Sequence, residues 1–246
     1  IIDLSVKLTG NKVNFYNSTI KVQSGSVLIE NLNILNNNHN LSNQWGIFID
    51  GVYKVVIRNN TINVTDKRAA YAIYVFQSGN VNVYNNNLIS SGGNLTYTLL
   101  AYGVENSKYI NNKVTTIGTG SLYSYGILTI YSSSNIISNN SVKVSSLVNN
   151  AYEKNVNGTL YTNSIVGIDL YFDSYDNVIE YKNNTVEGKD NYVYGFGVIG
   201  APTNSGEVKY SRNNTFAYNK VNVKGYNFAT GFISGYHSTA NDVIGN

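Results

Sequence analysis

The feature that most constrains this chain is a short asparagine motif that recurs along most of its length. The segment VVIRNNTINVT at 55–65 has relatives at 81–90, 109–116, 136–145, 179–187 and 210–216. The first asparagines of these pairs are Asn59, Asn85, Asn111, Asn139, Asn183 and Asn213, and their spacings are 26, 26, 28, 44 and 30 residues. Repeats of about 20–50 residues are typical of solenoids, propellers and arrays, in which each unit packs on its neighbours.

A second motif, a short apolar segment, precedes each pair. GIFI (46–49), AIYV (72–75), TLLA (98–101) and GILT (126–129) each begin 13 residues before the first asparagine of their copy. Two features that keep a fixed distance over four consecutive copies indicate one repeated structural unit. Later copies at 167–170, 195–198 and 231–234 have longer offsets because of insertions.

The composition favours strands joined by turns. There are 22 Tyr and only one Pro, and charged residues make up 13% of the chain, about half the usual share of a soluble domain. Val, Ile, Thr, Tyr and Asn dominate over strong helix formers, which is typical of strands and turns. An apolar share of 42% is enough to fill a core. We therefore expect an all-β fold.

The repeat predicts a right-handed parallel β-helix of about eight coils, forming a single domain over residues 1–246. One unit cannot bury its own apolar side, but a coil stacked at about 4.8 Å pairs the backbone and buries Ile57 and Ile62. The asparagine pair is expected to form the corner, since Asn tolerates the left-handed conformation and stacked carboxamides can bond from coil to coil. Leucine-rich repeats have a similar length, but these units lack the leucine spacing and the helical segment of such repeats, and propeller blades need about 40 or more residues.

Extra residues are distributed unevenly between the copies. We expect insertions at 35–44, 89–96 and 145–164 on one edge of the rod, and at 173–178 and 200–209 on the opposite corner. Residues 241–246 approach a further asparagine step. This pattern predicts a fragment of a larger surface protein.

The coil units resemble the parallel β-helix repeats of carbohydrate-binding proteins and sugar hydrolases. The Asn, Tyr and Ser bias with almost no Pro is especially similar to adhesin-like surface proteins of methanogenic archaea. This resemblance covers about residues 13–246 and implies an extracellular place at the cell surface or cell wall. It also implies a role in attachment, with a cell-surface glycan or protein as the partner. The solenoid itself hosts lyases, hydrolases, phage spikes and adhesins, so it indicates architecture better than function.

Charge and apolar patterning argue against two classes of partner. The net charge of +3 is spread thinly, whereas nucleic-acid surfaces cluster Lys and Arg. No stretch approaches the roughly 18 apolar residues of a membrane span. Without Cys, neither a disulfide framework nor a thiolate metal site can form. We expect neither nucleic-acid binding nor membrane insertion by this segment.

Three acidic residues cluster in the segment GIDLYFDSYD. Asp169 is expected to project outward from a strand, with Asp173 and Asp176 in the following loop. Three oxygen donors can bind Ca²⁺ or support hydrolysis, and they also suit a polar turn. Neighbouring coils offer no carboxylate at the matching positions, so no catalytic residue is assigned and no cofactor is required, with Ca²⁺ the one candidate.

Aromatic residues recur immediately before the Gly-type segment of most coils. They are Trp45, Tyr71, Tyr97, Tyr125 and Tyr194, interrupted by Val166 and Thr230. Equal positions stack in a solenoid, so these rings should form a ladder that either binds sugar rings or a protein partner, or fills the rod. A second row, Phe48, Tyr74, Leu100 and Leu128, is expected to form an exposed apolar stripe that contacts a partner or another copy.

Three asparagine sequons fall in predicted insertions, at Asn40, Asn94 and Asn157, and are the glycosylation candidates. Three functions stay open at this point. The first is a non-enzymatic adhesin-like protein or surface stalk that binds a glycan or protein. The second is a polysaccharide lyase or hydrolase, and the third is a structural filament segment whose open ends stack on other copies.

Overall fold

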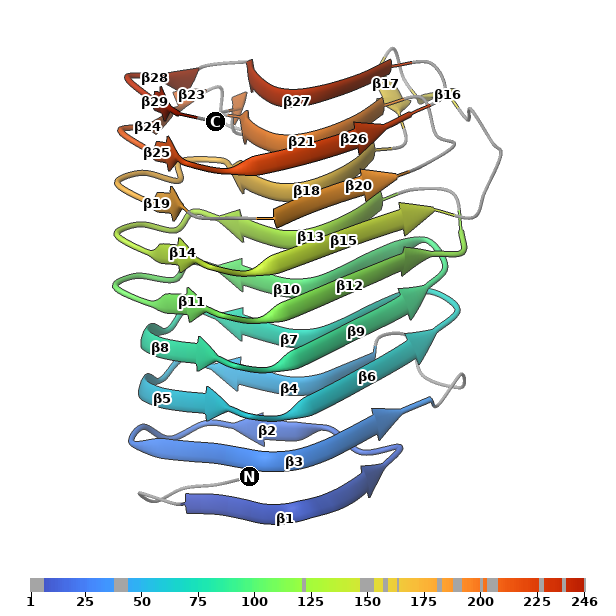
Figure 1. Cartoon of the computed structure of the whole chain (residues 1–246), viewed down its shortest axis with the longest axis vertical. Helices are drawn as coiled ribbons and strands as arrows, with labels where there is room; N and C mark the ends of the chain where they lie inside the picture. The colour runs from blue at the N-terminus through green and yellow to red at the C-terminus, as the bar shows by residue number, and fades with distance from the viewer. Residues whose placement is uncertain are drawn as a thin grey trace.

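The computed structural model shows a stack of coils along one long axis (Figure 1). It describes residues 7–37, 44–120, 123–146, 153–156, 159–162, 164–180, 183–187, 192–199, 201–202, 208–225, 228–235 and 238–245. All regular structure within these residues is β-strand, and the strands that join one coil to the next are parallel. The predicted all-β parallel solenoid is confirmed, and its hand stays a prediction.

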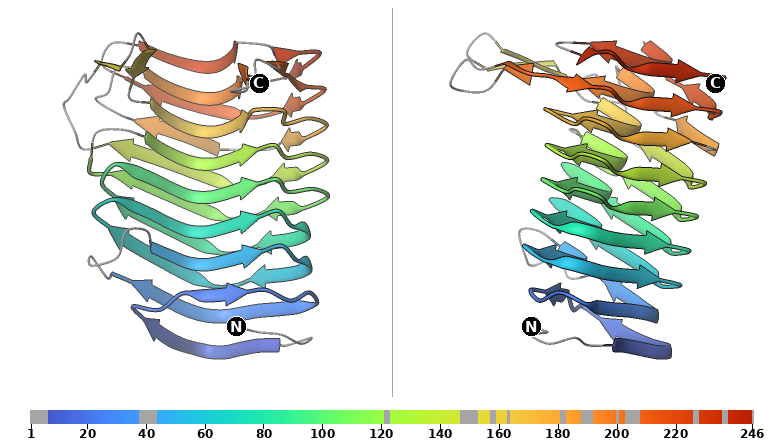
Figure 2. Two further views of the ribbon diagram at one scale, coloured as in Figure 1. Left: turned by 180° about the vertical axis from the view of Figure 1, so that it is seen from behind. Right: turned by 90° about the vertical axis from the view of Figure 1, so that its left-hand side faces the viewer.

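Each full coil contributes one strand to each of three faces. Face A is a sheet of β2 (Ile20–Val22), β4 (Gln44–Asp50), β7 (Ala69–Phe76), β10 (Leu95–Tyr102), β13 (Tyr123–Ile130), β18 (Ser164–Tyr171), β21 (Tyr192–Ile199) and β27 (Phe228–Gly235). Face B holds β5 (Tyr53–Arg58), β8 (Gly79–Tyr84), β11 (Lys108–Ile110), β14 (Ile136–Ser138), β19 (Val178–Glu180), β25 (Thr215–Ala217) and β29 (Asp242–Ile244). Face C holds β6 (Thr61–Asp66), β9 (Asn87–Gly92), β12 (Lys113–Gly118), β15 (Ser141–Ser146), β20 (Asn183–Glu187) and β26 (Lys220–Lys224). Face A lies in front when the molecule is seen from behind (Figure 2, left).

The remaining strands lie at the ends of the rod or in its loops. Strand β3 (Val27–Asn36) runs through faces B and C without a break and joins them into one sheet, and β1 (Lys7–Tyr16) pairs with it. A short pair is formed by β24 (Ser211–Arg212) and β28 (Ser238–Thr239). Two antiparallel hairpins are β16 (Glu153–Val156) with β17 (Thr159–Thr162), and β22 (Ala201–Pro202) with β23 (Val208–Lys209).

The coil count differs from the prediction of about eight. Within the described residues, about six turns carry a strand on all three faces. The upstream motif copies at 15–20 and 29–34 lie in β1, β2 and β3, which make incomplete coils because β3 crosses a corner as a single strand.

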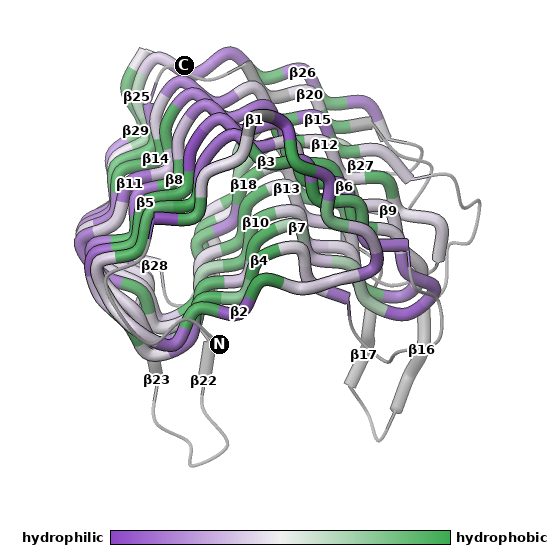
Figure 3. Tube along the Cα trace, turned by 90° about the horizontal axis from the view of Figure 1, so that it is seen from below, coloured by the Kyte–Doolittle hydropathy of each residue, from purple (hydrophilic) through white to green (hydrophobic). Residues whose placement is uncertain are grey.

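The interior is built from columns of equivalent residues. Viewed along the long axis, residues of like hydropathy superpose from coil to coil (Figure 3). The column on face A, for example, comprises Ile47, Ile73, Leu99, Ile127, Ile168 and Phe196, all buried. Stacked coils thus bury the apolar side that one unit alone would expose.

The small residue that opens each face A motif is explained by the approach of face C. A Cβ atom at Gly126 would lie 2.4 Å from the Val142 side chain and 2.5 Å from the carbonyl oxygen of Gly167. Gly46 and Gly195 face equally close side chains of face C. This position therefore accepts only small side chains where the two sheets come closest.

The two asparagines of each pair have different tasks at the corner between faces B and C. The first residue takes the left-handed conformation and is exposed, with φ of 56° at Asn59, 57° at Asn85, 56° at Asn111 and 52° at Asn139. The second residue is buried, and these second residues form a ladder of Asn60, Asn86, Asn112 and Asn140.

An amide inside this ladder, such as that of Asn112, is bonded to the coils on both sides. Asn112 Nδ2 donates to Asn140 Oδ1 at 3.0 Å and to the carbonyl oxygen of Val83 at 2.9 Å. Asn112 Oδ1 accepts from the backbone N and from Nδ2 of Asn86, each at 3.0 Å. The predicted bonding of carboxamides from coil to coil is confirmed, and it belongs to the second asparagine of the pair.

Two of the six asparagines predicted at this corner lie elsewhere. Asn183 is inside β20 and pairs with Ser141, so it follows the corner. Asn213 has a φ of 53° but lies at the corner between faces A and B. Its neighbour Asn214 belongs to a second buried ladder, which comprises Asn135, Asn177, Asn214 and Asn241. The correction arises because both corners place a left-handed residue before a buried asparagine, and at 213–214 this left-handed residue is also Asn.

The predicted insertions are confirmed in two places and wrong in two. Segments 145–164 and 200–209 contain the hairpins β16–β17 and β22–β23. Segment 89–96 is a regular connection, since β9 ends at Gly92 and β10 begins at Leu95. Segment 173–178 is the ordinary corner before β19. Residues 38–43 of the fifth predicted insertion, 35–44, lie outside the described residues.

The two adjacent asparagines of one coil provide a matched test of the ladder. Asn112→Ala removes four hydrogen bonds of the ladder and leaves two buried backbone groups, the N of Asn86 and the carbonyl oxygen of Val83, without their amide partner. Each such group costs about 1–3 kcal/mol, so we expect the free energy of unfolding to fall by at least about 2 kcal/mol. Asn111→Gly keeps the left-handed corner and should change the free energy of unfolding by less than about 0.5 kcal/mol. Urea unfolding followed by circular dichroism measures both, and equal losses would contradict the division of tasks.

Candidate functional site

The predicted aromatic ladder forms on the outer side of face A. Strand register places Trp45, Tyr71, Tyr97 and Tyr125 opposite one another in consecutive coils. Ring centroids are 5.4 Å apart both between Tyr71 and Tyr97 and between Tyr97 and Tyr125. Val166 separates Tyr194 from the stack, as the sequence predicts. These side chains are half-buried and do not belong to the apolar core, so they line the surface of the rod.

The second predicted row also lies on the outer side, but it is not the exposed stripe that was expected. Phe48 and Tyr74 stack at 5.1 Å, and Trp45 stacks on Phe48 at 5.3 Å. Leu100 and Leu128 are only 7% and 5% exposed. Longer aromatic side chains on the flanking columns shield these two leucines from water, so the exposed-stripe prediction is wrong at their positions.

A third aromatic column, which the sequence pattern did not single out, continues the surface toward face B. Phe76 and Tyr102 have centroids 5.5 Å apart, and Tyr102 contacts Tyr131 at 5.4 Å. Tyr131 in turn stacks on Phe172 at 5.6 Å. Phe76 and Tyr102 lie two residues beyond the second row, and strand side chains alternate with a period of two, so the sequence contained the signal for them. Tyr131 and Phe172 lie one residue further along and belong to the next column.

A hollow of about 230 Å³ lies in the middle of this surface. Its lining is Tyr97, Tyr123, Tyr125, Leu128, Ile130 and Tyr171. Burial raises the pKa of Tyr97 and of Tyr125 above the usual phenol value, so both hydroxyl groups stay protonated in neutral solution. The hollow therefore offers flat aromatic faces and neutral hydroxyl groups.

One acidic residue is buried in the outer layer of face A. Asp169 occupies the second row between Leu128 and Gly197, projects outward as predicted, and is 2% exposed. Its Oδ1 atom has no hydrogen-bond partner in the described structure, and burial raises its pKa to about 7. A Cβ atom at Gly197 would lie 2.4 Å from Oδ1, so glycine makes the room for this carboxyl group.

The structure does not gather the three predicted acidic residues into one cluster. Asp173 Oδ1 accepts a hydrogen bond from Arg212 Nη1 at 3.0 Å, and Asp176 is exposed at a corner with a φ of 53°. Across the part of the chain that is described, no group of three His, Cys, Asp or Glu side chains could hold a metal ion. For the glycosylation candidates, Asn94 is exposed in a turn, while Asn40 and Asn157 lie outside the described residues.

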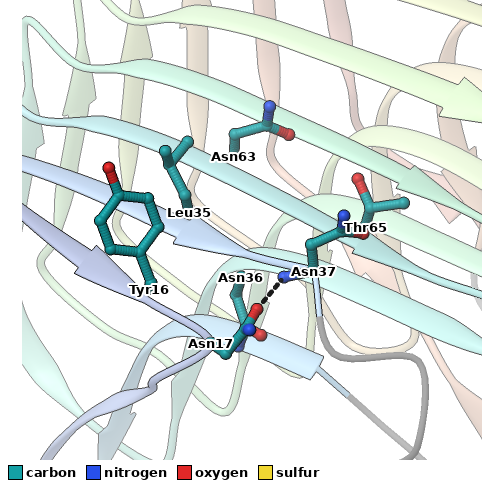
Figure 4. A pocket seen from close by; sticks show the side chains of 7 residues that line it. All are labelled: Tyr16, Asn17, Leu35, Asn36, Asn37, Asn63 and Thr65. Atoms are coloured by element: carbon teal, nitrogen blue, oxygen red, sulfur yellow. Dashed lines mark hydrogen bonds between the residues drawn. The ribbon is translucent and has the colours of Figure 1, made fainter.

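A further hollow of about 400 Å³ lies at the N-terminal coils, on the side of face C (Figure 4). Its lining is Tyr16, Asn17, Leu35, Asn36, Asn37, Asn63 and Thr65, and the backbone N of Asn37 donates to Asn17 Oδ1 at 3.0 Å. Asn37 in its lining is the last residue before 38–43, which the structure does not describe, and no role is assigned to this hollow.

No protein-family model and no curated protein matches the chain. Among solved structures, the chain is similar to the A-module of a mannuronan C-5 epimerase from Azotobacter vinelandii, with 11% identity and a TM-score of 0.37 over 99% of this chain and 80% of that chain. It is also similar to a mutant of DFA-IIIase from Arthrobacter chlorophenolicus in complex with DFA-III, with 12% identity and a TM-score of 0.38 over 99% and 67%. Likeness at this level carries no argument about what this chain binds.

The buried carboxyl group of Asp169 predicts a pH-dependent stability. Its folded pKa of about 7 is above the ordinary value of 3.8, so the folded state holds this proton while the unfolded state loses it. Stability should therefore fall as pH rises from about 4 to about 7, by on the order of 4 kcal/mol, since each pKa unit of difference is worth about 1.4 kcal/mol. Urea unfolding at several pH values measures this, and Asp169→Asn should remove most of the dependence. A wild-type profile that is flat over this range would contradict it.

Proposed function

We propose that this chain is part of an extracellular adhesin-like or surface-stalk protein that holds a cell-surface glycan on face A. The observation that carries the proposal is the outer surface of face A, where aromatic columns stay in register over consecutive coils and surround a hollow. An aromatic surface on a soluble rod is an established mark of an interaction site.

Sugar rings fit the chemistry of this surface. Tyrosine and tryptophan rings present flat apolar faces, and their polar tips form hydrogen bonds. The phenols of the hollow are neutral, so they can donate to and accept from sugar hydroxyl groups without attracting ions. The rings are carried by strands rather than loops, which keeps them positioned before a ligand arrives.

The proposed cellular setting rests on the resemblance of the Asn-, Tyr- and Ser-rich coils to adhesin-like surface proteins. A protein partner or another copy of the chain would meet the same rings as anchors. In the described residues, no helix has the length and apolar character needed to cross a membrane.

A polysaccharide lyase or hydrolase is the second candidate, and one observation favours it. The Asp169 carboxyl group has a pKa of about 7, which suits proton transfer near neutral pH. Binding is better supported, because the Asp173 carboxylate is paired with Arg212 and Asp176 is exposed at a corner, outside any acidic cluster with Asp169 in the described part of the chain. Breakdown of a polysaccharide that is lost in Asp169→Asn would favour the enzyme.

Glycan binding by face A can be tested with two variants at the rim of the hollow. A glycan array with the wild-type chain identifies a ligand, and calorimetry then measures its Kd for Tyr123→Ala and Tyr171→Ala. We expect each variant to bind roughly two- to tenfold more weakly, because one stacked ring contributes about 0.5–1.5 kcal/mol.

The matched control is Tyr84→Ala, which removes a tyrosine from the outer side of face B, where its hydroxyl oxygen accepts from Arg58 at 3.1 Å. Its affinity should equal that of the wild type, and circular dichroism should show that all three variants are folded. An array without any bound glycan, or affinities that are unchanged in both rim variants, would overturn the proposal.

A further inference from the structure

A second column of outward residues follows the corner between faces A and B. Strand register and isolated bridges place its members opposite one another in consecutive coils, in the order Tyr53, Gly79, Glu105, Ser133, Tyr175 and Arg212. We call it the corner column. From Tyr53 to Tyr175 large side chains alternate with small ones, and coils are about 4.8 Å apart. Each small residue therefore leaves a space about one ring thick between two large neighbours.

The two small residues of the corner column, Gly79 and Ser133, differ in their surroundings. A Cβ atom at Gly79 would lie 2.5 Å from Cε1 of Tyr53 and 3.2 Å from Cγ of Glu105, so the Tyr53 ring already covers Gly79. The Tyr53 hydroxyl lies 3.4 Å from Glu105 Oε1. Above Ser133, by contrast, there is an open hollow of about 350 Å³, the corner slot. Its lining also includes Gln77, Gly103 and Tyr131, which form the neighbouring column.

Aromatic rings bound the corner slot on two sides. The Arg212 guanidinium lies 4.6 Å from the centroid of the Tyr175 ring and is held by Asp173 at 3.0 Å. Arg212 belongs to the coil beyond Tyr175, so the opposite face of this ring is directed toward Ser133 and the slot. Tyr131, 37% exposed, forms the second aromatic side and is supported by Phe172.

The corner slot also contains an acidic group without a cation. Glu30, Asp50 and Asp173 are each paired with a Lys or Arg. Glu105 is exposed, and within the described residues its carboxylate contacts the Tyr53 hydroxyl but no cationic side chain. A carboxylate beside tyrosine faces attracts a cation, through charge and through the electron-rich rings.

We propose that the corner slot binds an amine-bearing sugar ring, with the ring stacked on Tyr175 and its ammonium group on Glu105. The space above Ser133 lies between Glu105 and Tyr175, which belong to the two adjacent coils, and its volume is near the lower end of the about 300–1,000 Å³ of ligand pockets. Ser133 and Gln77 provide a hydroxyl and an amide for the sugar hydroxyl groups. The site is separate from face A, because none of its lining residues belongs to the hollow there.

Three tetrasaccharides with the same β-1,4 linkage test this assignment. They are built from glucosamine, from N-acetylglucosamine and from glucose, and calorimetry measures each Kd at low salt and about pH 6, where the free amine is protonated. We expect the glucosamine oligomer to bind at least about tenfold more tightly than the other two. The net charge of the chain is +3, so overall attraction cannot produce a preference for the cationic ligand.

Two variants locate the preference. Glu105→Gln keeps the shape and removes the charge, so all three oligomers should bind with similar affinity. Ser133→Tyr fills the slot and should remove the preference as well, and the column already accepts tyrosine at Tyr53 and Tyr175. The control Glu180→Gln makes the same charge change on face B outside the slot and should keep the wild-type preference.

These measurements test the corner slot independently of the hollow on face A. Equal affinities of the wild type for the three oligomers would overturn the proposal, and so would a preference that persists in Glu105→Gln or Ser133→Tyr. Tyr123→Ala reports on face A alone. It should weaken binding of the glucose oligomer and leave the preference for the glucosamine oligomer intact.

Discussion

The buried asparagine ladder is the interaction on which the rest of this structure depends. Backbone pairing alone allows one coil to slip along another, and a slip of one residue would turn every inward side chain outward. The amides of Asn86, Asn112 and Asn140 resist this slip, because their bonds from one coil to its neighbour, to side-chain amide and backbone N alike, are all about 3 Å long. An amide that lost its partners would be buried without hydrogen bonds, so the correct register is favoured over its neighbours.

Fixed register converts a linear sequence into columns, and the columns create the surfaces. A residue type that recurs once per coil forms a continuous stripe, in which neighbouring members are about 4.8 Å apart. On face A the stripes are aromatic, and the rings support one another at 5.1–5.8 Å. Asp169 is the exception within these stripes, and Gly197 provides the space that its carboxyl group occupies. Burial of an unpaired carboxyl group costs free energy of desolvation. A column that served only to pack the coils would not require such a group.

The two candidate surfaces follow from the same rule but differ in chemistry. The hollow on face A is lined by tyrosines and aliphatic side chains, which suits uncharged ring faces. The corner slot combines tyrosines with the carboxylate of Glu105, which suits a ring that carries positive charge. The two proposed sites lie on adjacent sides of the rod and differ in the charge of the sugar ring that each would accept.

The sequence by itself determined the fold class and the aromatic ladder. The repeat fixed which residues are equivalent, and a period of two fixed which of them share a side, so Trp45, Tyr71, Tyr97 and Tyr125 could be aligned without coordinates. It could not separate the two corners, because Asn59 and Asn213 show the same local motif while insertions shift their coils. Only the tertiary structure decided that Leu128 is covered and that Ser133 is open. The cover over Leu128 and the space at Ser133 both depend on the length of side chains in neighbouring coils. The slot also joins residues from Tyr53 to Tyr175, which approach one another only after the coils have stacked.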